Sequence, residues 1–382
     1  MTKTLNCNMP LFTIDDARDA QGNVKYGIKS MFDIAAKLKD SIIMWGAPGL
    51  GKSESVKQWN NEQVVKHNGR WNPVITDVRL SMKEPVDMIG IPVITNGQTV
   101  WATPNMWPTE DERYDGGVIL IDEMNQGQPA ILNAAFQLIQ DRQLGDYKVP
   151  NGYVIIAASN PACYNNTVSE FSLPLINRFS HFNIKSDFDS WMNYRLNNGG
   201  NVDVLSFLTS QDRSMLFKGF DDVDESESVF DSIVITPRSW EVVERLLNLP
   251  DIPLDQKKAY ATGRLGLAIT ARLFEYLENK DKYQSCDEIL VEGKNFKSED
   301  VNQFFATQIS CISKINTTAD DETCRKYVLN FLKATRNLQS NAFKATNLTT
   351  LISSKRLLGK TKIFNPMLDA NDLLKLITSA LK

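Results

Sequence analysis

The sequence contains few of the residues that disulfide frameworks, zinc sites and imidazole-based catalysis require. It has five cysteines without a CxxC pair, and its two histidines are His67 and His181. An odd number of widely spaced cysteines argues against a disulfide framework and against a zinc knuckle. So few histidines leave little material for a catalytic triad or a cluster of imidazole ligands. We therefore interpret the cysteines as buried free thiols and both histidines as structural residues.

Long apolar runs and a strong excess of one charge are also missing. No run approaches the roughly 20 apolar residues that a membrane-spanning helix needs, and the N-terminal MTKTLNCNMP lacks the apolar stretch of a secretory signal. The net charge of −4 gives no general attraction to nucleic acid, although a local basic groove stays open. With 42% hydrophobic and 23% charged residues over 382 positions, we expect a globular, cytoplasmic protein of about two or three packing units.

Apolar runs alternate with amphipathic stretches between residues 41 and 187, as expected for buried parallel strands joined by helices. Helices are expected from Lys52 to about His67 and from Pro129, a favourable first helical residue, to about Arg142. The strand candidates are short, apolar and bounded by Gly, Pro, Asn or a charge: Ser41–Trp45, Pro73–Arg79, Val118–Ile121 and Tyr153–Ala158. The pattern predicts an α/β domain.

Two segments interrupt this alternation and favour inserted hairpins. In Gly90–Pro104 the pair Asn96-Gly97 stands between alternating apolar residues, which is the strongest short-range signal for a β-hairpin. In Gln143–Ile155 the pair Asn151-Gly152 precedes the expected strand. We therefore expect two hairpins within the α/β domain.

Helical spacing dominates after Asp187. Thr236 and Pro237 are a favourable cap and first residue for a helix that continues through SWEVVERLLNL. From about Lys280 the sequence indicates further helices with polar linkers. The second half of the chain is therefore expected to be mostly helical.

Residues 46–53 read GAPGLGKS, which satisfies the phosphate-binding pattern GxxxxGK[ST] between an expected strand and an expected helix. Glycines in such a loop let backbone N–H groups surround phosphates, with the positive end of the helix dipole behind them. Lys52 is expected to reach the β- and γ-phosphates of ATP, and the Ser53 hydroxyl to ligate Mg²⁺. The expected nucleotide-binding residues of this segment are Gly46, Ala47, Pro48, Gly49, Leu50, Gly51, Lys52, Ser53 and Glu54.

Polar side chains follow two further expected strands. The run VILI leads to Asp122 and Glu123, and YVIIAAS leads to Asn160. Ligands bind at the carboxyl ends of parallel strands, so these side chains are expected at the nucleotide. Asp122 is the candidate second ligand of Mg²⁺, and Glu123 is the candidate general base for the attacking water. Asn160 is placed to orient that water beside the γ-phosphate.

Two arginines are candidates for stabilising charge in the transition state. Arg178 in LPLINRF could serve as an arginine finger supplied to a neighbouring subunit, and Arg238 could reach the γ-phosphate from the helical part of the chain. Exposed arginines are common, so the residues alone leave both assignments open.

The ordered segments GAPGLGKS, DMIGIPV, GGVILIDEMNQGQPAILNAAFQLIQDRQL, IIAASNP, LPLINRF and TPRSW resemble the MoxR type of AAA+ ATPase over roughly residues 30 to 280. The resemblance implies an α/β P-loop AAA+ core with a parallel sheet flanked by helices, followed by a helical lid. It identifies Gly46–Ser53 as Walker A, and Asp122 and Glu123 as Walker B. It further assigns Asn160 as sensor 1, Arg178 as arginine finger and Arg238 as sensor 2.

The same resemblance divides the chain and suggests its assembly. Residues 1–187 correspond to the nucleotide-binding core, 188–280 to the helical lid and 281–382 to a mostly helical extension of unknown role. A hexameric homo-oligomer with ATP at subunit interfaces is implied, with the two hairpins as the helix-2 insert and the pre-sensor-1 hairpin near the ring pore. Gln126 departs from the basic residue that relatives usually carry there, which leaves the role of that position open.

Three functions agree with these motifs. The first is an ATP-driven motor that remodels or helps assemble a protein client or adaptor, with a von Willebrand A domain as the partner that the resemblance suggests. The second is a nucleic-acid motor, in which Trp101 or Lys148 on the hairpins would contact a strand, although the acidic charge balance weighs against it. The third is a switch that assembles on ATP without remodelling a client.

Overall fold

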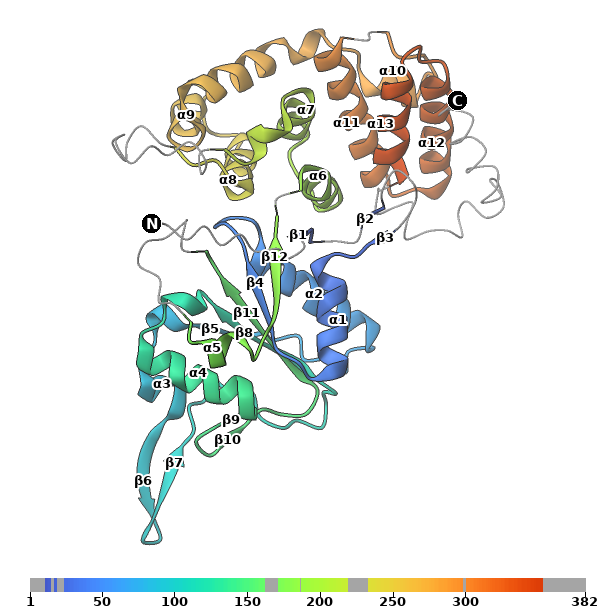
Figure 1. The fold of residues 1–382 in the computed structure, drawn as a ribbon. Coiled ribbons are helices and arrows are strands. Elements are labelled where there is room, and N and C mark those ends of the chain that lie inside the picture. Colours follow the sequence, from blue (N-terminus) through green and yellow to red (C-terminus); the bar gives the residue numbers. More distant parts are fainter. Residues whose placement is uncertain are drawn as a thin grey trace. The chain divides into compact units, whose positions relative to one another are not determined.

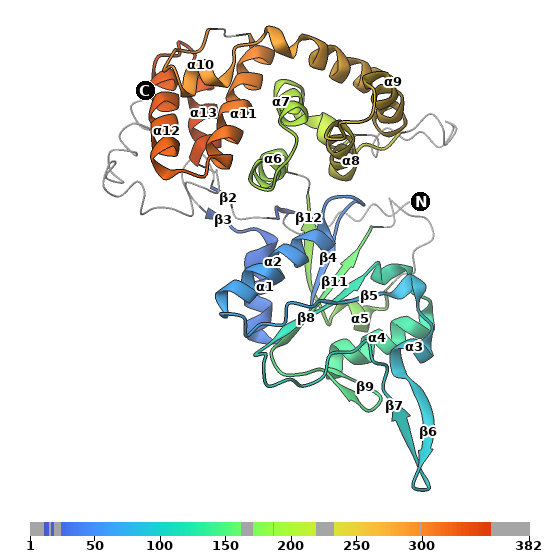
Figure 2. The same cartoon turned by 180° about the vertical axis from the view of Figure 1, so that it is seen from behind.

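The computed structural model describes residues 11–14, 17–18, 24–161, 171–185, 187–218, 233–297 and 300–352. The chain separates into two compact units, Met1–Asp187 and Phe188–Lys382, which we call the first unit and the second unit (Figures 1 and 2). Each unit is described below by itself. Within the described residues, no helix combines the length and the apolar character needed to cross a membrane.

The first unit is built on a six-stranded parallel sheet with the order β1-β12-β4-β11-β8-β5. Its strands are β1 (Leu11–Phe12), β12 (Ser180–Ile184), β4 (Ile42–Trp45), β11 (Tyr153–Ser159), β8 (Gly117–Asp122) and β5 (Thr76–Arg79). The predicted α/β fold with a parallel sheet flanked by helices is confirmed, and each predicted strand is present. The strands β1 and β12 were not predicted. A two-stranded ribbon, β2 (Ala17–Arg18) with β3 (Val24–Lys25), lies outside this sheet.

Helices cover both faces of the sheet because successive side chains of its strands point to opposite sides. On one face, Ile42, Met44 and Leu120 share a core with α1 (Ile28–Leu38) and α2 (Lys52–Lys66). On the other face, Ile43, Ile119 and Ile121 share a core with α3 (Pro85–Ile89), α4 (Pro129–Asp141) and α5 (Leu173–Ile176). The helices α2 and α4 begin at the predicted residues.

The hairpin predicted from Asn96-Gly97 is present as β6 (Ile91–Thr95) and β7 (Gln98–Ala102). Both turn residues have positive φ, 51° and 73°, as a tight hairpin turn requires. In Figure 1 this ribbon extends away from α3 and α4. Every residue of its two strands is exposed.

The second predicted hairpin is shorter, with β9 (Gln143–Leu144) paired to β10 (Tyr147–Lys148). Its turn lies at Gly145-Asp146 and not at Asn151-Gly152, which instead leads into β11. Gly152 has φ 77°, and a Cβ there would lie 1.9 Å from the Asp115 carbonyl oxygen. Only glycine fits this close approach of two chain segments.

The second unit is built from helices. Its helices are α6 (Phe188–Asn197), α7 (Val202–Ser210), α8 (Pro237–Leu247), α9 (Leu254–Asn279), α10 (Cys286–Leu290), α11 (Val301–Thr317), α12 (Asp321–Arg336) and α13 (Asn341–Ile352). Thr236 caps α8 in a reciprocal capping box with Ser239, and Pro237 is its first residue, as predicted. The acidic run 221–228 lies outside the described residues.

Two hydrophobic cores hold the helices of the second unit. Trp240 of α8 and Phe207 of α7 lie in one core with residues of α9. Leu205 of α7 and Leu196 of α6 lie in the other, with residues of α10 to α13 such as Phe331. Residues on both sides of the predicted boundary near 280 therefore share a core.

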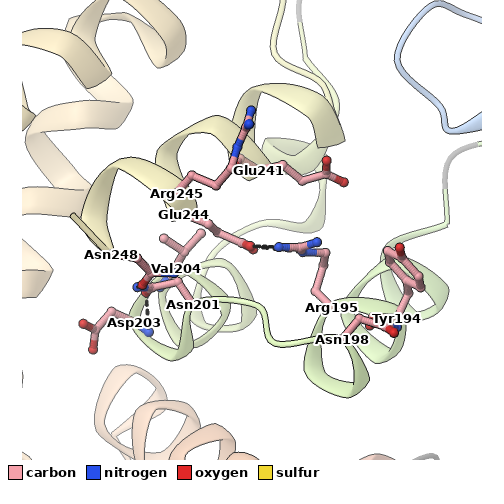
Figure 3. A network of polar contacts seen from close by, with 10 residues as sticks. All are labelled: Tyr194, Arg195, Asn198, Asn201, Asp203, Val204, Glu241, Glu244, Arg245 and Asn248. Carbon is pink, nitrogen blue, oxygen red and sulfur yellow. Dashed lines mark hydrogen bonds and ion pairs between the residues drawn. The ribbon is translucent and has the colours of Figure 1, made fainter. Parts of the chain in front are cut away.

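A polar network joins three helices of the second unit (Figure 3). The Arg195 guanidinium of α6 donates to the Glu244 carboxylate of α8, with an Nε–Oε2 distance of 3.0 Å. Asn201 caps α7, and its Nδ2 donates to Asn248 Oδ1 at the end of α8 at 2.6 Å. These contacts fix α8 against the junction of α6 and α7.

Free thiols are found at Cys286, Cys311 and Cys324, of which Cys311 and Cys324 are buried as expected. Burial raises the pKa of the Cys311 thiol well above its ordinary value. Cys7 and Cys163 lie outside the described residues.

Candidate nucleotide-binding site

The loop between β4 and α2 has the backbone geometry of a phosphate-binding loop. Gly49 and Gly51 have φ 79° and 87°, in the left-handed region that glycine adopts without strain. A Cβ on Gly46 would lie 2.8 Å from the Ile184 carbonyl oxygen. The loop therefore requires glycine at these positions, and α2 begins directly after it at Lys52. The N-terminus of a helix favours an anion, because its backbone N–H groups and the positive end of its dipole point toward the ligand.

The Lys52 ammonium is buried and surrounded by oxygens. Its Nζ donates to the Gly46 and Ala47 carbonyls at 2.7 and 3.0 Å and to Asn160 Oδ1 at 2.7 Å. The contact with Asn160 joins the P-loop to the end of β11. None of these three oxygens carries a formal charge, and an ammonium forms stronger hydrogen bonds with phosphate oxygens than with neutral acceptors.

Asp122 lies at the end of β8, next to the first turn of α2. Its Oδ2 accepts from Ser53 Oγ at 2.6 Å, and its Oδ1 accepts from the Glu123 backbone N–H at 2.9 Å. A hydroxyl beside a carboxylate offers the hard oxygen ligands that Mg²⁺ prefers. Burial is the main cause that raises the pKa of Asp77 on the neighbouring β5, and the charge of Asp122 adds to it.

No group of three or more His, Cys, Asp or Glu that could hold a metal is present among the described residues. This agrees with the way Mg²⁺ is commonly held in phosphate-transfer sites, by one or two protein ligands together with water and substrate phosphates. Ser53 and Asp122 therefore fit Mg²⁺ bound together with a nucleotide, and they do not fit a closed all-protein metal site.

Glu123 has a backbone conformation that is unusual for a residue other than glycine. Its φ and ψ are 52° and 39°, in the left-handed region. Its Oε2 accepts from Ser81 Oγ at 2.9 Å, and Ser81 belongs to the short 3₁₀ turn that follows β5. Left-handed residues other than glycine concentrate at functional sites. The sequence analysis did not identify Ser81, although it follows an expected strand end as Asp122 does.

Asn125 is a second residue that the sequence analysis did not assign a role. Its Nδ2 donates to the Asn160 backbone carbonyl at 2.6 Å, and the side chain is buried. Its Oδ1 finds no hydrogen-bond partner among the residues that the structure describes. Asn160 is thus held at its backbone by Asn125 and at its side chain by Lys52.

The structure brings together residues that were predicted as Walker A, Walker B and sensor 1. Lys52 contacts Asn160, and Ser53 contacts Asp122, at the carboxyl ends of the neighbouring strands β4, β11 and β8. Pro48 and Gly49 are partly exposed and Glu54 is exposed in the first turn of α2, whereas Leu50 is buried.

The two candidate arginines lie in different units. Arg178 is exposed in the turn after α5 of the first unit, and Arg238 is exposed in the first turn of α8 in the second unit. Neither takes part in the contacts described above between Lys52, Asn160, Ser53 and Asp122. Their roles stay predictions.

The family model of the AAA domain (dynein-related subfamily) matches residues 41–179. This segment begins just before β4 and ends in the turn after α5, so it contains each candidate site residue except Arg238. This segment is similar to AAA domains, and the similarity supports the predicted ATPase activity. The narrower assignment to the MoxR type stays a prediction.

Among solved structures, the chain is similar to a putative ATPase from Cytophaga hutchinsonii, with 13% identity and a TM-score of 0.33 over 66% of this chain and 88% of that one. NtrX from Brucella abortus, in complex with ADP, has 14% identity and a TM-score of 0.32 over 66% of this chain and 67% of that one. Hsp104 with ATPγS and FITC casein has 14% identity and a TM-score of 0.32 over 62% of this chain and 42% of that one. No curated protein matches the chain.

Proposed function

We propose that the chain is a Mg²⁺-dependent ATPase of the MoxR type that forms a homo-oligomeric ring, hexameric as the resemblance suggests, and remodels or helps assemble a protein partner. The observation that supports this most is the joining of three strand ends through Lys52–Asn160 and Ser53–Asp122. An enzyme that binds ATP between the P-loop and these strand ends needs this arrangement.

In the proposed mechanism the P-loop binds the phosphates of ATP. The backbone N–H groups of residues 49–51 and the start of α2 surround them, and Lys52 exchanges its neutral oxygen partners for phosphate oxygens. Mg²⁺ bound at Ser53 and Asp122 would neutralise charge on the phosphates. The hydroxyl of Ser53 and the carboxylate of Asp122 already lie side by side, so little rearrangement is needed to accept it.

Glu123 and Asn160 act on the attacking water. The Glu123 carboxylate accepts a proton from that water as general base, while the hydrogen bond from Ser81 to its Oε2 keeps the carboxylate in place. The Asn160 amide orients the water once Lys52 has turned to phosphate. Asn125 keeps the backbone of Asn160 in place through the 2.6 Å contact.

Arg178 is proposed to act in trans, because an exposed guanidinium on a turn can reach a nucleotide held by a neighbouring subunit. Arg238, exposed at the start of α8, is proposed to sense the γ-phosphate from the helical unit. In the proposed cycle, ATP and ADP favour different placements of the helical unit, and this population shift performs the work.

A protein client is favoured over nucleic acid by the ribbon β6–β7. Its residues 91–102 contain no Lys or Arg, and its exposed side chains include Ile91, Ile94 and Trp101, with Ile94 81% exposed. Apolar side chains on an exposed ribbon suit contact with an extended protein segment, whereas a nucleic-acid groove is basic. A client or adaptor with a von Willebrand A domain is the partner that the resemblance suggests.

The test is to trap the ATP-bound protein with Glu123→Gln. We expect hydrolysis to fall by about 10²–10⁴-fold while ATP binding remains, because only the general base is lost. The trapped protein should sediment as a ring and retain a protein partner in a pull-down, compared with Lys52→Ala as the control that lacks ATP.

Other outcomes point elsewhere. Hydrolysis at the wild-type rate by Glu123→Gln would contradict the assignment of the base. Salt-dependent retention of DNA in place of a protein would favour the nucleic-acid motor. A ring that forms on ATP, binds no partner and turns over slowly would favour the assembly switch.

A further inference from the structure

His181 forms a side-chain bridge between the P-loop strand and the helix that precedes Arg178. Trp45, the last residue of β4, donates from Nε1 to His181 Nδ1 at 2.9 Å. His181 Nε2 lies 2.7 Å from the Ile176 carbonyl oxygen at the end of α5. Trp45 is followed directly by Gly46, the first residue of the P-loop. The imidazole thus lies between the two chain segments that carry the P-loop and Arg178.

The chemistry of the two partners fixes what each ring nitrogen does. An indole N–H can only donate and a carbonyl oxygen can only accept. Nδ1 of His181 is therefore the acceptor, and Nε2 carries the proton. The planes of the Trp45 and His181 rings are nearly parallel, with an angle of 6° between them. Both nitrogens are used, so the neutral imidazole is a specific connector and not only a packing residue.

The carbonyl that His181 binds belongs to the turn that carries Arg178. Within this turn the Arg178 N–H donates to the Leu175 carbonyl at 3.1 Å, and the Phe179 N–H donates to the Ile176 carbonyl at 3.4 Å. Phe179 is buried in the core between the sheet and α4. Arg178 is thus held between an anchored carbonyl on one side and a buried ring on the other, while its own side chain is exposed.

Pairing of β12 with β4 does not by itself explain a histidine at this position. The backbone register pairs His181 with Ile43 and Asn183 with Trp45, and any strand-forming residue satisfies it. What histidine adds is a donor and an acceptor on opposite sides of one ring. A side chain with a single polar end reaches only one of the two partners.

We propose that His181 is a positioning residue that couples the P-loop of a subunit to its own Arg178, and through Arg178 to the nucleotide of the neighbouring subunit. This rests on the proposed role of Arg178 as an arginine finger. When a nucleotide binds to or leaves the P-loop, a displacement of Trp45 moves His181. His181 in turn moves the Ile176 carbonyl, which belongs to the turn that carries Arg178.

The experiment separates an effect on a subunit's own site from an effect on its neighbour. His181→Asn keeps an acceptor for Trp45 but is too short to bind Ile176, so it releases the Arg178 turn and leaves the P-loop side connected. We expect kcat of the pure variant to fall about tenfold with little change in KM for ATP, because a misplaced catalytic group costs rate more than binding. His67→Asn is the matched control, since His67 also lies beside a tryptophan, Trp71, and should leave kcat unchanged.

Mixing with Lys52→Ala subunits gives the decisive measurement. These subunits lack their own ATP but present an intact Arg178 turn, so they should restore hydrolysis to His181→Asn and to Arg178→Ala alike. Recovery for Arg178→Ala without recovery for His181→Asn would overturn the proposed coupling, as would an unchanged kcat of the pure His181→Asn protein. No recovery for Arg178→Ala would instead remove the arginine finger on which the proposal rests.

A second variant tests the proposal in case the first one does not fold. If His181→Asn does not fold, His181→Gln takes its place, since its amide can still donate to Ile176 but cannot accept from Trp45 in the same position. Uncoupling from the P-loop side should then lower kcat and should again be rescued by Lys52→Ala subunits. A folded His181→Gln protein with wild-type kcat would overturn the proposal.

Discussion

Both units bury polar side chains, but they use them for different purposes. In the first unit the buried Lys52 and Asn125 lie at one edge of the sheet, where their partners include Asn160. In the second unit Glu244 and Lys257 are buried between helices, where Lys257 Nζ donates to the Leu247 carbonyl at the end of α8 at 3.0 Å. The first arrangement gathers groups that a ligand can use, and the second connects helices.

The difference follows from the two architectures. A parallel sheet brings the carboxyl ends of its strands to one edge, so polar residues placed after several strands meet at one place. Helices packed around cores have no such shared edge, and a buried polar group there must find its partner on the helix next to it. Substitutions should therefore cost activity in the first unit and stability in the second.

The largest effect on stability is expected at Glu244. This carboxylate is 1% exposed and the guanidinium of Arg195 is 16% exposed. Burial raises the pKa of Glu244, and its contact with Arg195 opposes that rise. Glu244→Ala leaves a largely buried guanidinium without its carboxylate, which should lower the free energy of unfolding by about 3–5 kcal/mol.

Denaturant unfolding of the full chain measures this loss. Glu241→Ala on the same helix, a less buried carboxylate drawn in Figure 3, is the matched control and should cost no more than about 0.5 kcal/mol. Equal losses for the two variants would mean that the buried pair does not hold α8.

The second prediction concerns Lys52 in the first unit, where the expected loss is in ATP binding and not in stability. Lys52→Ala removes the ammonium expected to bind phosphate oxygens, so the Kd for ATP should rise about a hundredfold, since hydrogen bonds to charged groups contribute about 1.5–3 kcal/mol each. Titration with a fluorescent ATP analogue measures it, and Lys57→Ala, an exposed lysine on the same helix, is the control. Wild-type affinity would show that the buried ammonium serves the fold and not the ligand.

Sequence patterns identified the central sheet because its strands are apolar and end in chemically distinctive residues. The run VILI before Asp122 and the turn Asn96-Gly97 were both read correctly, since each signal is local. The strand β12 was missed because SHFNI contains no apolar run. Its place in the sheet depends on pairing with β4, which lies far away in the sequence.

In the candidate site, too, local patterns were predicted correctly and a contact that depends on long-range pairing was missed. Lys52, Ser53, Asp122 and Asn160 were predicted to meet at a nucleotide, and the structure brings them into contact. Ser81 was missed because its contact with Glu123 depends on β5 lying next to β8, which no local pattern specifies.

A third prediction sharpens the role of that contact. Ser81→Ala removes one hydrogen bond to Glu123, so the base is less well placed and kcat should fall about fivefold, as expected for a loss of about 1 kcal/mol. In the Glu123→Gln background the same change should have no further effect, because Ser81 acts through Glu123. An additional loss in that background would show that Ser81 acts on the reaction by another route.

The smallest effect is expected at an exposed ion pair of the first unit, which has the same charges as the pair in the second unit. The Arg113 guanidinium and backbone N–H both donate to Asp111 and lower the pKa of that carboxyl from 3.8 to about 2. Because the folded pKa is the lower one, the pair stabilises the folded chain above pH 3.8 and loses this contribution as the pH falls toward about 2.

Arg113→Ala should raise the pKa of Asp111 only part of the way to 3.8, since the backbone N–H of residue 113 remains as a donor. An NMR titration of the Asp111 carboxyl measures this shift. The thermal midpoint at pH 7 should fall only slightly, because water screens an exposed pair and solvates either partner alone. If Arg113→Ala lowered the midpoint as much as Glu244→Ala, burial would not be what separates the two units, and the contrast between a ligand-binding edge and a helix-connecting network would need another cause.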